Sequence, residues 1–262
     1  MNSLQLKRYF SDKIDPNLSN LAKIISYPNL STSEFIKRIE EMQDLGITDI
    51  IFEGNTQIGK VSILGKGSVS IVLKARIENK TYALKIRRMD ANRRTMLREA
   101  SVHQMVNTIG IGPKLFKFSE NLIIMEFIDG LSIVDWIRQQ CLNKYRVLNI
   151  VTNILKQCFI LDMANINHGE LSNLNYHIIV SYSDRVSVID FESTSLNKKK
   201  SNNVTSASQS LFISGMISHY INNILNLLSK DSIIEKLRAY KKDQNVTNFD
   251  SLIQTLSKSV QY

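Results

Sequence analysis

Hydrophobic and polar residues follow two different periods along the chain, and the period changes near residue 47. Up to that point the period is helical. The apolar positions that carry it are Phe35, Ile36, Ile39, Met42 and Leu45. Ser31-Thr32-Ser33-Glu34 forms an N-cap cluster before this run, and Gly46 follows it as a stop signal. We therefore expect residues 1–47 to be helical.

From Ile47 to Arg87 the pattern changes to that of β-strands. The expected strands are Ile58–Leu64, Val69–Ile77 and Thr81–Arg87. Residues 65–67 separate the first two strands, and residues 78–80 form the turn before the third. The pattern predicts antiparallel hairpins.

A helix is expected next, with Asp90 as its cap. Its apolar face consists of Met96, Leu97, Ala100, Val102, Met105 and Val106. Residues 110–113 break the chain, and a strand pair over Lys114–Phe118 and Leu122–Glu126 follows. Residues 125–130 then lead into a helix over Ser132–Gln140.

The second half of the chain is mainly helical apart from one hairpin. A long apolar helix is expected over Leu148–Asn165, and the hairpin pairs His177–Tyr182 with Arg185–Ile189 around a turn at 183–184. The closing helices are expected over Ser208–Leu228, Ser232–Lys241 and Phe249–Ser257. The order of elements predicts an α+β fold, with a β-rich first part and a mainly helical second part.

Composition narrows the class of protein. The chain has 262 residues, 43% hydrophobic and 22% charged, and no apolar run near the ~20 residues of a membrane span. It begins without a secretory h-region, so we expect a cytoplasmic protein without membrane contact. Cys141 and Cys158 lack metal-ligand spacing and are expected to be buried hydrophobes. The net charge of +9 favours anionic partners.

One segment carries most of the candidate chemistry. Glu170 and Asn175 are five positions apart in a loop after the long helix, and the hairpin returns Asp190 to the same place. An acid with a second acid and an amide resembles the phosphoryl-transfer centre of protein kinases. There one acid orients the acceptor hydroxyl, while the Asn and the Asp hold Mg²⁺.

A glycine-rich segment lies in the strand region. Gly65 and Gly67 alone are a weak signal, because tight turns also favour glycine. The signal strengthens because Val72 follows at the spacing of the kinase phosphate-binding loop, and Ala83 and Lys85 come one hairpin later. Ser70 replaces the third glycine of that pattern.

Glu99 on the expected helix can face Lys85. Taken alone, Glu99 is better explained as a surface residue paired with Arg94 or Arg98, but with Lys85 in place the Lys85–Glu99 pair becomes the better interpretation. The stretch Arg87–Arg98 is strongly basic. Such a stretch is usually a solvated face, and a surface for RNA or an acidic protein is the alternative.

Taken together, these motifs occur in protein-kinase order over residues 58–192. The chain is similar to the compact atypical kinases of the RIO and Bud32 groups, and it resembles an archaeal family of predicted serine/threonine kinases. The stretches that carry the resemblance are residues 64–67, 83–88, 168–172, 190–193 and 201–206. The resemblance implies a bilobal kinase fold: an N-terminal extension over 1–47, a first lobe over 48–127 and a second lobe over 128–262.

The resemblance also implies the ligands, ATP with Mg²⁺ or Mn²⁺, and the residues that bind them. Lys85 would neutralise the phosphates and Glu99 would position it, while Asn175 and Asp190 would hold the metal. Glu170 would be the catalytic carboxylate. The residues expected to line the nucleotide site are Gly65, Lys66, Gly67, Ser68, Val72, Ala83, Met125, Glu126 and Ile128. Among these, the carbonyl of Glu126 and the N–H of Ile128 would bind the adenine edge, with Met125 guarding the pocket.

Besides Ser70, two residues depart from the kinase pattern. Glu170 stands where these kinases have Asp, which moves the carboxylate one methylene further from the backbone. Glu192 replaces the glycine of the metal-binding motif, so a flipping activation switch is disfavoured.

The sequence thus favours a serine/threonine protein kinase, with autophosphorylation expected in the hydroxyl-rich segment 193–208 beside Lys198–Lys200. Three alternatives stay open. They are an ATP-binding switch or slow ATPase in ribosome or tRNA-modification assembly, a small-molecule kinase, and a kinase-shaped binding protein without catalysis.

Overall fold

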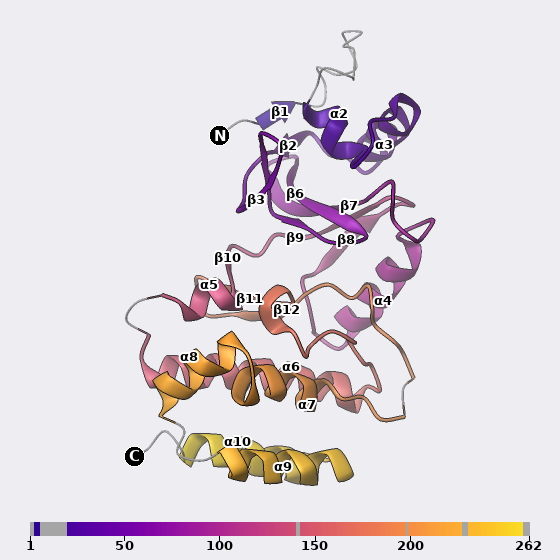
Figure 1. The fold of residues 1–262 in the computed structure, drawn as a ribbon. Coiled ribbons are helices and arrows are strands. Elements are labelled where there is room, and N and C mark those ends of the chain that lie inside the picture. The colour runs from indigo at the N-terminus through magenta and orange to yellow at the C-terminus, as the bar shows by residue number, and fades with distance from the viewer. Residues whose placement is uncertain (1–2, 6–19, 140–141, 198, 227–229, 259–262) are drawn as a thin grey trace. The chain divides into compact units, whose positions relative to one another are not determined.

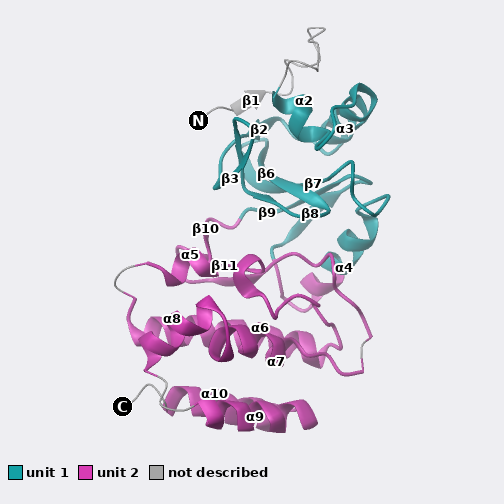
Figure 2. Ribbon diagram, in the orientation of Figure 1, with its two compact units in different colours: residues 1–104, 113–127 teal, residues 105–112, 128–262 magenta. Residues whose placement is uncertain are grey.

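The chain divides into two compact units (Figure 2). Unit 1 comprises residues 1–104 and 113–127, and unit 2 comprises residues 105–112 and 128–262. The structure, a computed structural model, describes residues 3–5, 20–139, 142–197, 199–226 and 230–258. Expectations for residues 6–19, Gln140, Cys141 and Lys198 lie outside that range. Unit 1 is built on a β-sheet and unit 2 is mainly helical, so the predicted α+β class is confirmed.

The sheet of unit 1 is antiparallel and has the strand order β1-β2-β6-β7-β9-β8, with β5 paired to β6 (Figure 1). Its strands are β1 Ser3–Gln5, β2 Asp49–Ile51, β5 Gly65–Lys66, β6 Ser70–Ile77, β7 Lys80–Arg87, β8 Leu115–Phe118 and β9 Leu122–Glu126. The central hairpin β6–β7 pairs Ser70 with Arg87 at one end and Ile77 with Lys80 at the other. The expected strands over 69–77, 81–87, 114–118 and 122–126 are therefore confirmed.

Two helices precede the sheet along the chain: α2 Asn20–Ile25 and α3 Thr32–Asp44. The Ser31 side chain caps α3 by accepting a hydrogen bond from the Glu34 amide, and Gly46 follows the helix at φ +84°. Both helices pack their apolar faces into the same core as β2, β6 and β7. The helical expectation for residues 1–47 is wrong at Ser3–Gln5, because these residues pair with β2 as an edge strand.

The expected single strand Ile58–Leu64 is also wrong. The chain forms instead a separate hairpin of β3 Thr56–Ile58 and β4 Val61–Ile63. Gly59 at φ +59° makes the two-residue turn between them, a conformation that a glycine adopts without steric cost.

The helix after β7 begins later than expected. Helix α4 spans Leu97–Thr108, and Asp90 does not cap it. The Asp90 carboxylate instead forms a bidentate pair with the Arg88 guanidinium, at 2.8 and 2.6 Å. The basic stretch 87–96 is therefore not helical, and only its last residues 97–98 lie on α4.

Unit 2 is organised around the long helix α6 Lys144–Met163, which Asn143 caps. The other elements are β10 Gly130–Ser132, α5 Ile133–Ile137, a 3-10 turn at Leu174–Tyr176, β11 Ile178–Ser181, β12 Val186–Val188, α7 Asn203–Ser208, a π-helical turn at Gln209–Ile213, α8 Met216–Leu225, α9 Lys230–Lys242 and α10 Val246–Lys258. The expected hairpin is confirmed as β11–β12, and β10 adds a third strand that the sequence pattern did not reveal.

The expected helix Ser208–Leu228 is broken into pieces. A π-helical turn ends at Ile213, Gly215 has φ +98°, and α8 begins at Met216. The glycine conformation interrupts the helical hydrogen bonds, so the apolar period alone was misleading there.

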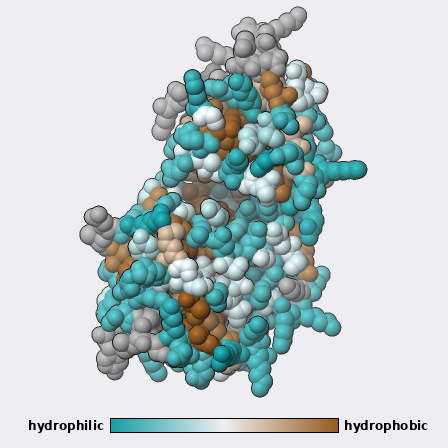
Figure 3. Space-filling view, in the orientation of Figure 1, coloured by the Kyte–Doolittle hydropathy of each residue, from teal (hydrophilic) through white to brown (hydrophobic). Residues whose placement is uncertain are grey.

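The molecular surface in Figure 3 has an ordinary mixture of hydrophilic and hydrophobic side chains. On the face shown in Figure 3 hydrophilic side chains predominate, and hydrophobic ones gather in small separate patches, which is ordinary. None of the described helices has the length and apolarity to cross a membrane.

Candidate active site

The glycine-rich segment of unit 1 forms a short hairpin. Residues 65–66 pair with residues 71–72 of β6, and the Gly67 amide donates to the Ser70 carbonyl at 2.8 Å. Neither Gly65 nor Gly67 has a positive φ. A Cβ atom added at Gly65 would meet no protein atom within 4 Å, so packing inside unit 1 does not require a glycine there.

Strand register brings the other predicted residues of unit 1 beside this hairpin. Val72 pairs with Lys85 across β6 and β7, and Ala83 pairs with Met125 across β7 and β9. Met125 and Glu126 end β9 in unit 1, whereas Ile128 is a buried residue of unit 2. The Glu126 carboxylate accepts a hydrogen bond from the Lys114 amide at 3.1 Å.

Lys85 and Glu99 form the ion pair expected from the sequence. Nζ of Lys85 lies 2.6 Å from Oε1 of Glu99, and the two side chains are 5% and 4% exposed. The second oxygen of Glu99 lies 3.6 Å from the Arg93 guanidinium. Moving a charged group from water into the protein interior costs roughly several kcal/mol per ion. Such a pair therefore adds little net stability over apolar packing.

In unit 2, the loop before Glu170 is held by its backbone and by one buried histidine. Nε2 of His168 lies 3.0 Å from the Ile189 carbonyl, and since a carbonyl only accepts, Nε2 carries the hydrogen. Gly169 has φ +94°, and an added Cβ there would lie 2.8 Å from the Ser193 carbonyl oxygen. Glycine is therefore required at this position.

Glu170 itself is accessible. Its side chain is 38% exposed, and Nε2 of His177 lies 3.9 Å from its carboxylate. Asn175 lies a few residues on, in the half-buried 3-10 turn that precedes β11.

The β11–β12 hairpin places Asp190 beside this turn. Ile178 pairs with Val188, and the Ile189 amide donates to the His177 carbonyl at 2.9 Å. Extended by one more pair, this register sets Asp190 opposite Tyr176, the residue after Asn175. Asp190 has φ +68°, an uncommon left-handed conformation of the kind that collects at functional sites. The positive φ falls on Asp190 and not on Glu192.

A buried hydrogen-bond network supports the same loop, and its residues are not among the predicted site residues. The Asn203 side chain accepts from the His168 amide at 2.9 Å and donates to the Ile166 carbonyl at 2.6 Å. Asn203 is held in turn by Asp162 on α6, which accepts from both its backbone and its side-chain N–H groups.

Asp162 also accepts from the Val204 amide and the Tyr240 hydroxyl, at 3.1 and 3.0 Å. Burial raises the pKa of Asp162, and these hydrogen bonds oppose that shift in part. Burial likewise raises the pKa of the Tyr240 phenol, which keeps it a donor. A charged residue four positions after Cys158 on an apolar helix face was the available sequence signal for this network.

The predicted metal ligands fit a hard cation. An Asn amide oxygen and an Asp carboxylate are oxygen donors of the kind Mg²⁺ prefers, and Mg²⁺ usually takes only one or two protein ligands besides waters and substrate phosphates. Among the described residues no cluster of three or more His, Cys, Asp or Glu is arranged to hold a metal.

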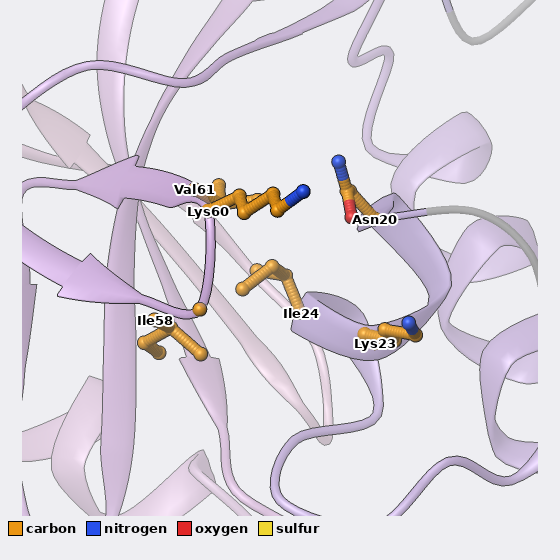
Figure 4. Close-up of a pocket in the computed structure, with 7 residues that line it drawn as sticks. Asn20, Lys23, Ile24, Ile58, Lys60 and Val61 are labelled. Atoms are coloured by element: carbon orange, nitrogen blue, oxygen red, sulfur yellow. The ribbon is translucent and has the colours of Figure 1, made fainter.

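A cavity of about 380 Å³ in unit 1 lies elsewhere, between α2 and the β3–β4 turn (Figure 4). Side chains of α2, such as Ile24, and of the hairpin, such as Ile58 and Lys60, approach it from opposite sides. None of the predicted site residues lines it, so it is no part of the candidate site.

Comparison with known proteins identifies a matching family and a similar archaeal protein. Residues 68–205, more than half of the chain, match the sequence profile of the RIO domain. The chain is also similar to the uncharacterized protein MJ1211 of Methanocaldococcus jannaschii, with 34% identity over 103 residues, which are 39% of this chain and 84% of that protein. The residues matched by the RIO-domain profile, 68–205, include Val72, Lys85, Glu170, Asn175 and Asp190.

Proposed function

The chain belongs to the RIO domain family, which is kinase-like, and from this premise we propose that it is an ATP-dependent serine/threonine protein kinase. The proposal assigns the first lobe to residues 48–127, the second lobe to residues 128–262 and an N-terminal extension to residues 1–47.

The buried Lys85–Glu99 pair is the observation that carries the proposal. An unbalanced lysine inside the sheet of unit 1 would be costly, and Glu99 on α4 balances it within 2.6 Å. In a kinase such a pair fixes the ammonium group where the α- and β-phosphates bind. We assign Lys85 to charge neutralisation and Glu99 to the positioning of Lys85.

Unit 2 supplies the remaining roles. Asn175 and Asp190 would hold the divalent metal, and the accessible carboxylate of Glu170 would orient the acceptor hydroxyl and take its proton. The metal and the nucleotide, when bound, supply the phosphoryl group and offset the charge of its oxygens. What the chain contributes is positioning and electrostatic stabilisation, because phosphoryl transfer asks for little covalent chemistry from the protein.

The residues near the expected nucleotide support the same assignment. Gly65 is not explained by packing, and close approach of a phosphate to backbone N–H groups is a reason for glycine. We assign Gly65, Lys66, Gly67, Ser68 and Val72 to the phosphates. For the adenine we assign Ala83, Met125, Glu126 and Ile128.

Autophosphorylation in segment 193–208 is proposed with a narrower set of acceptors than the sequence offered. The hydroxyl-bearing residues Thr194, Ser201 and Ser208 are at most 2% exposed, whereas Ser193 is exposed. A phosphate on Ser193 would be accessible to the exposed lysines at 199 and 200.

A second function, slow ATP hydrolysis as an assembly switch, is favoured by the glutamate at position 170. Its carboxylate stands one methylene further out than that of an aspartate, and a misplacement of ~1 Å can cost about 100-fold in rate. RNA or an acidic protein would be the partner of such a switch. Arg87, Arg88 and Arg93 already bond within unit 1, which reduces the basic surface available for it.

The test is incubation of the protein with γ-labelled ATP and Mg²⁺ or Mn²⁺, with and without generic protein substrates. Label on protein and free phosphate are followed separately. Acid-stable label on Ser or Thr supports the kinase, and free phosphate alone supports the ATPase. Neither product from wild-type protein would remove both.

A further inference from the structure

We infer that Tyr27, which follows helix α2, is a positioning residue for the glycine-rich loop of residues 65–70. Its ring and its carbonyl connect the N-terminal helices to that loop through Arg88. The inference rests on the proposed function, in which this loop encloses the phosphates of ATP.

The first link is the Tyr27 ring. Nζ of Lys66 lies 5.1 Å from the ring centroid, and the guanidinium carbon of Arg88 lies 5.2 Å from it. Both distances are within the range of a cation–π interaction, which at exposed sites contributes about 0.5–1 kcal/mol. One ring thus contacts a residue of the loop and a residue at the end of β7.

The second link runs through the Arg88 guanidinium. Nη1 of Arg88 donates to the Gly67 carbonyl at 2.6 Å, which holds the loop at its tip. Asp90 binds the same guanidinium in a bidentate manner and fixes its plane. The Arg88 guanidinium therefore cannot reorient without breaking its contact with the Gly67 carbonyl, the Asp90 carboxylate or the Tyr27 ring.

Backbone hydrogen bonds complete the connection. The Met89 amide donates to the Tyr27 carbonyl at 2.8 Å, and the Arg88 amide donates to the Val69 carbonyl at 2.8 Å. Tyr27 itself is half-buried and packs against the core that α2, α3 and the sheet share. The loop is thus anchored at Gly67 and Val69 to a segment that Tyr27 ties to the core.

In unit 1 the loop would bind the phosphates, while the N-terminal helices would keep the loop ordered. A phosphate-binding loop must hold its N–H groups in place, and a small misplacement is costly. Exposed glycine-rich backbone loses conformational entropy when it is ordered. The Tyr27–Arg88–Gly67 contacts order this loop before a nucleotide arrives, so the N-terminal helices take part in nucleotide binding without touching the reacting atoms.

The test compares Tyr27→Leu with Tyr27→Phe, which keeps the ring and removes only the hydroxyl. Phe52→Ala is the matched control, because Phe52 is a half-buried aromatic on the same core and makes none of these loop contacts. The first readout is hydrogen exchange of the amides of residues 67–70 without nucleotide. Loss of two ring–cation contacts should speed exchange about tenfold in Tyr27→Leu and leave Tyr27→Phe near wild type.

The second readout is steady-state kinetics. We expect Tyr27→Leu to raise KM for ATP about tenfold with kcat within about threefold, because uniform binding of the phosphates is weakened. Arg88→Leu breaks the same link from its other end and should reproduce both effects, even if Tyr27→Leu does not fold.

Wild-type exchange of the loop in folded Tyr27→Leu, or equal acceleration in Phe52→Ala, would overturn the inference. If Tyr27→Leu does not fold, wild-type exchange in Arg88→Leu overturns it. Because exchange is measured without nucleotide, its outcome is separate from that of the proposed function. A protein that binds no ATP refutes the function, whereas a loop unaffected by Tyr27 refutes the positioning role.

Discussion

Glu170 combines exposure with proximity to a second ionisable group. Its carboxylate is 38% exposed and lies 3.9 Å from Nε2 of the largely buried His177, in a loop whose backbone is fixed by Gly169 and Asn203. The proposed function assigns this carboxylate to the acceptor hydroxyl.

Substitution of Glu170 tests its role as the catalytic carboxylate. Glu170→Gln keeps the shape and removes the charge, so we expect a loss of phosphoryl transfer of about 10²–10⁴-fold, the usual contribution of a positioned acid or base. ATP affinity should be unchanged. Glu170→Asp should not exceed wild type, since the loop is built for the longer acid. Glu235→Gln, on the exposed side of α9, is the control; transfer by Glu170→Gln at the wild-type rate would exclude Glu170 as the base.

Asp162 is expected to influence stability with a particular pH dependence. Its folded pKa is raised by burial above the ordinary 3.8, so the folded state binds the proton more tightly than the unfolded state. The stability contributed by the protonated form is therefore fully present below pH 3.8 and is lost as pH rises through the higher folded pKa. Asp162→Asn removes this titration.

We expect Asp162→Asn to destabilise the protein by about 1–3 kcal/mol, because Asn cannot accept from all the N–H and O–H groups that surround Asp162. Urea unfolding across pH 3.5–7 (approximate range) measures both effects. The variant's deficit should shrink as pH rises above 3.8. A deficit that grows with pH would mean that Asp162 is ionised more easily in the folded state.

Some functional residues could be identified from the sequence and others could not. Lys85, Glu99 and Asp190 could be found because their spacing follows a known order of motifs. The charge of Asp162 on an apolar helix face was visible in the sequence, but its pairing with Asn203 was not. Most partners of these two side chains are backbone groups of residues 166, 168, 203 and 204, and a backbone group leaves no mark in the sequence.

At the scale of elements, the alternation of polar and apolar residues and their helical periodicity predicted most strands and helices. Two glycines determined where some of these elements begin and end. Gly59 turns the expected strand 58–64 into a hairpin, and Gly215 divides the expected helix 208–228. Both have positive φ, and the sequence shows the glycine but not its conformation. Asp90 looked like a helix cap, yet the bidentate pairing with Arg88 was the stronger interaction.

The loop 166–175 offers a prediction at this scale. Gly169→Ala would place Cβ 2.8 Å from the Ser193 carbonyl at φ +94°. The strained backbone should cost about 1–3 kcal/mol, and the contact adds to it. Gly110→Ala is the matched control, because Gly110 has φ +75° and nothing within 4 Å of its added Cβ.

Urea unfolding of the two alanine variants separates the cost of the strained backbone from the cost of the steric contact with Ser193. Gly110→Ala should show the conformational cost alone, and Gly169→Ala should be less stable than Gly110→Ala. Gly169→Ala should also lose transfer activity, since the paired backbone of Asn167 and Ser195 would have to shift. Equal stability of the two variants would show that the Ser193 contact relaxes at no cost.

At the scale of the whole molecule, the proposed reaction draws on both units. Lys85 and Glu99 belong to unit 1, while Glu170, Asn175 and Asp190 belong to unit 2. Each set is well defined inside its own unit by strand register or by a buried network. The proposed function assigns both sets to the same phosphoryl-transfer reaction.

A double-mutant cycle on phosphoryl transfer tests this requirement most directly. Single-turnover transfer of γ-labelled phosphate is measured for wild type, Lys85→Ala, Asp190→Ala and the double variant, with Lys80→Ala on the same strand as the control. Residues that act as one catalytic unit are strongly non-additive. We therefore expect each single variant to lose at least about 100-fold in rate and the double variant to be little worse than either. Losses that multiply, or wild-type transfer by either single variant, would contradict one shared phosphoryl-transfer site.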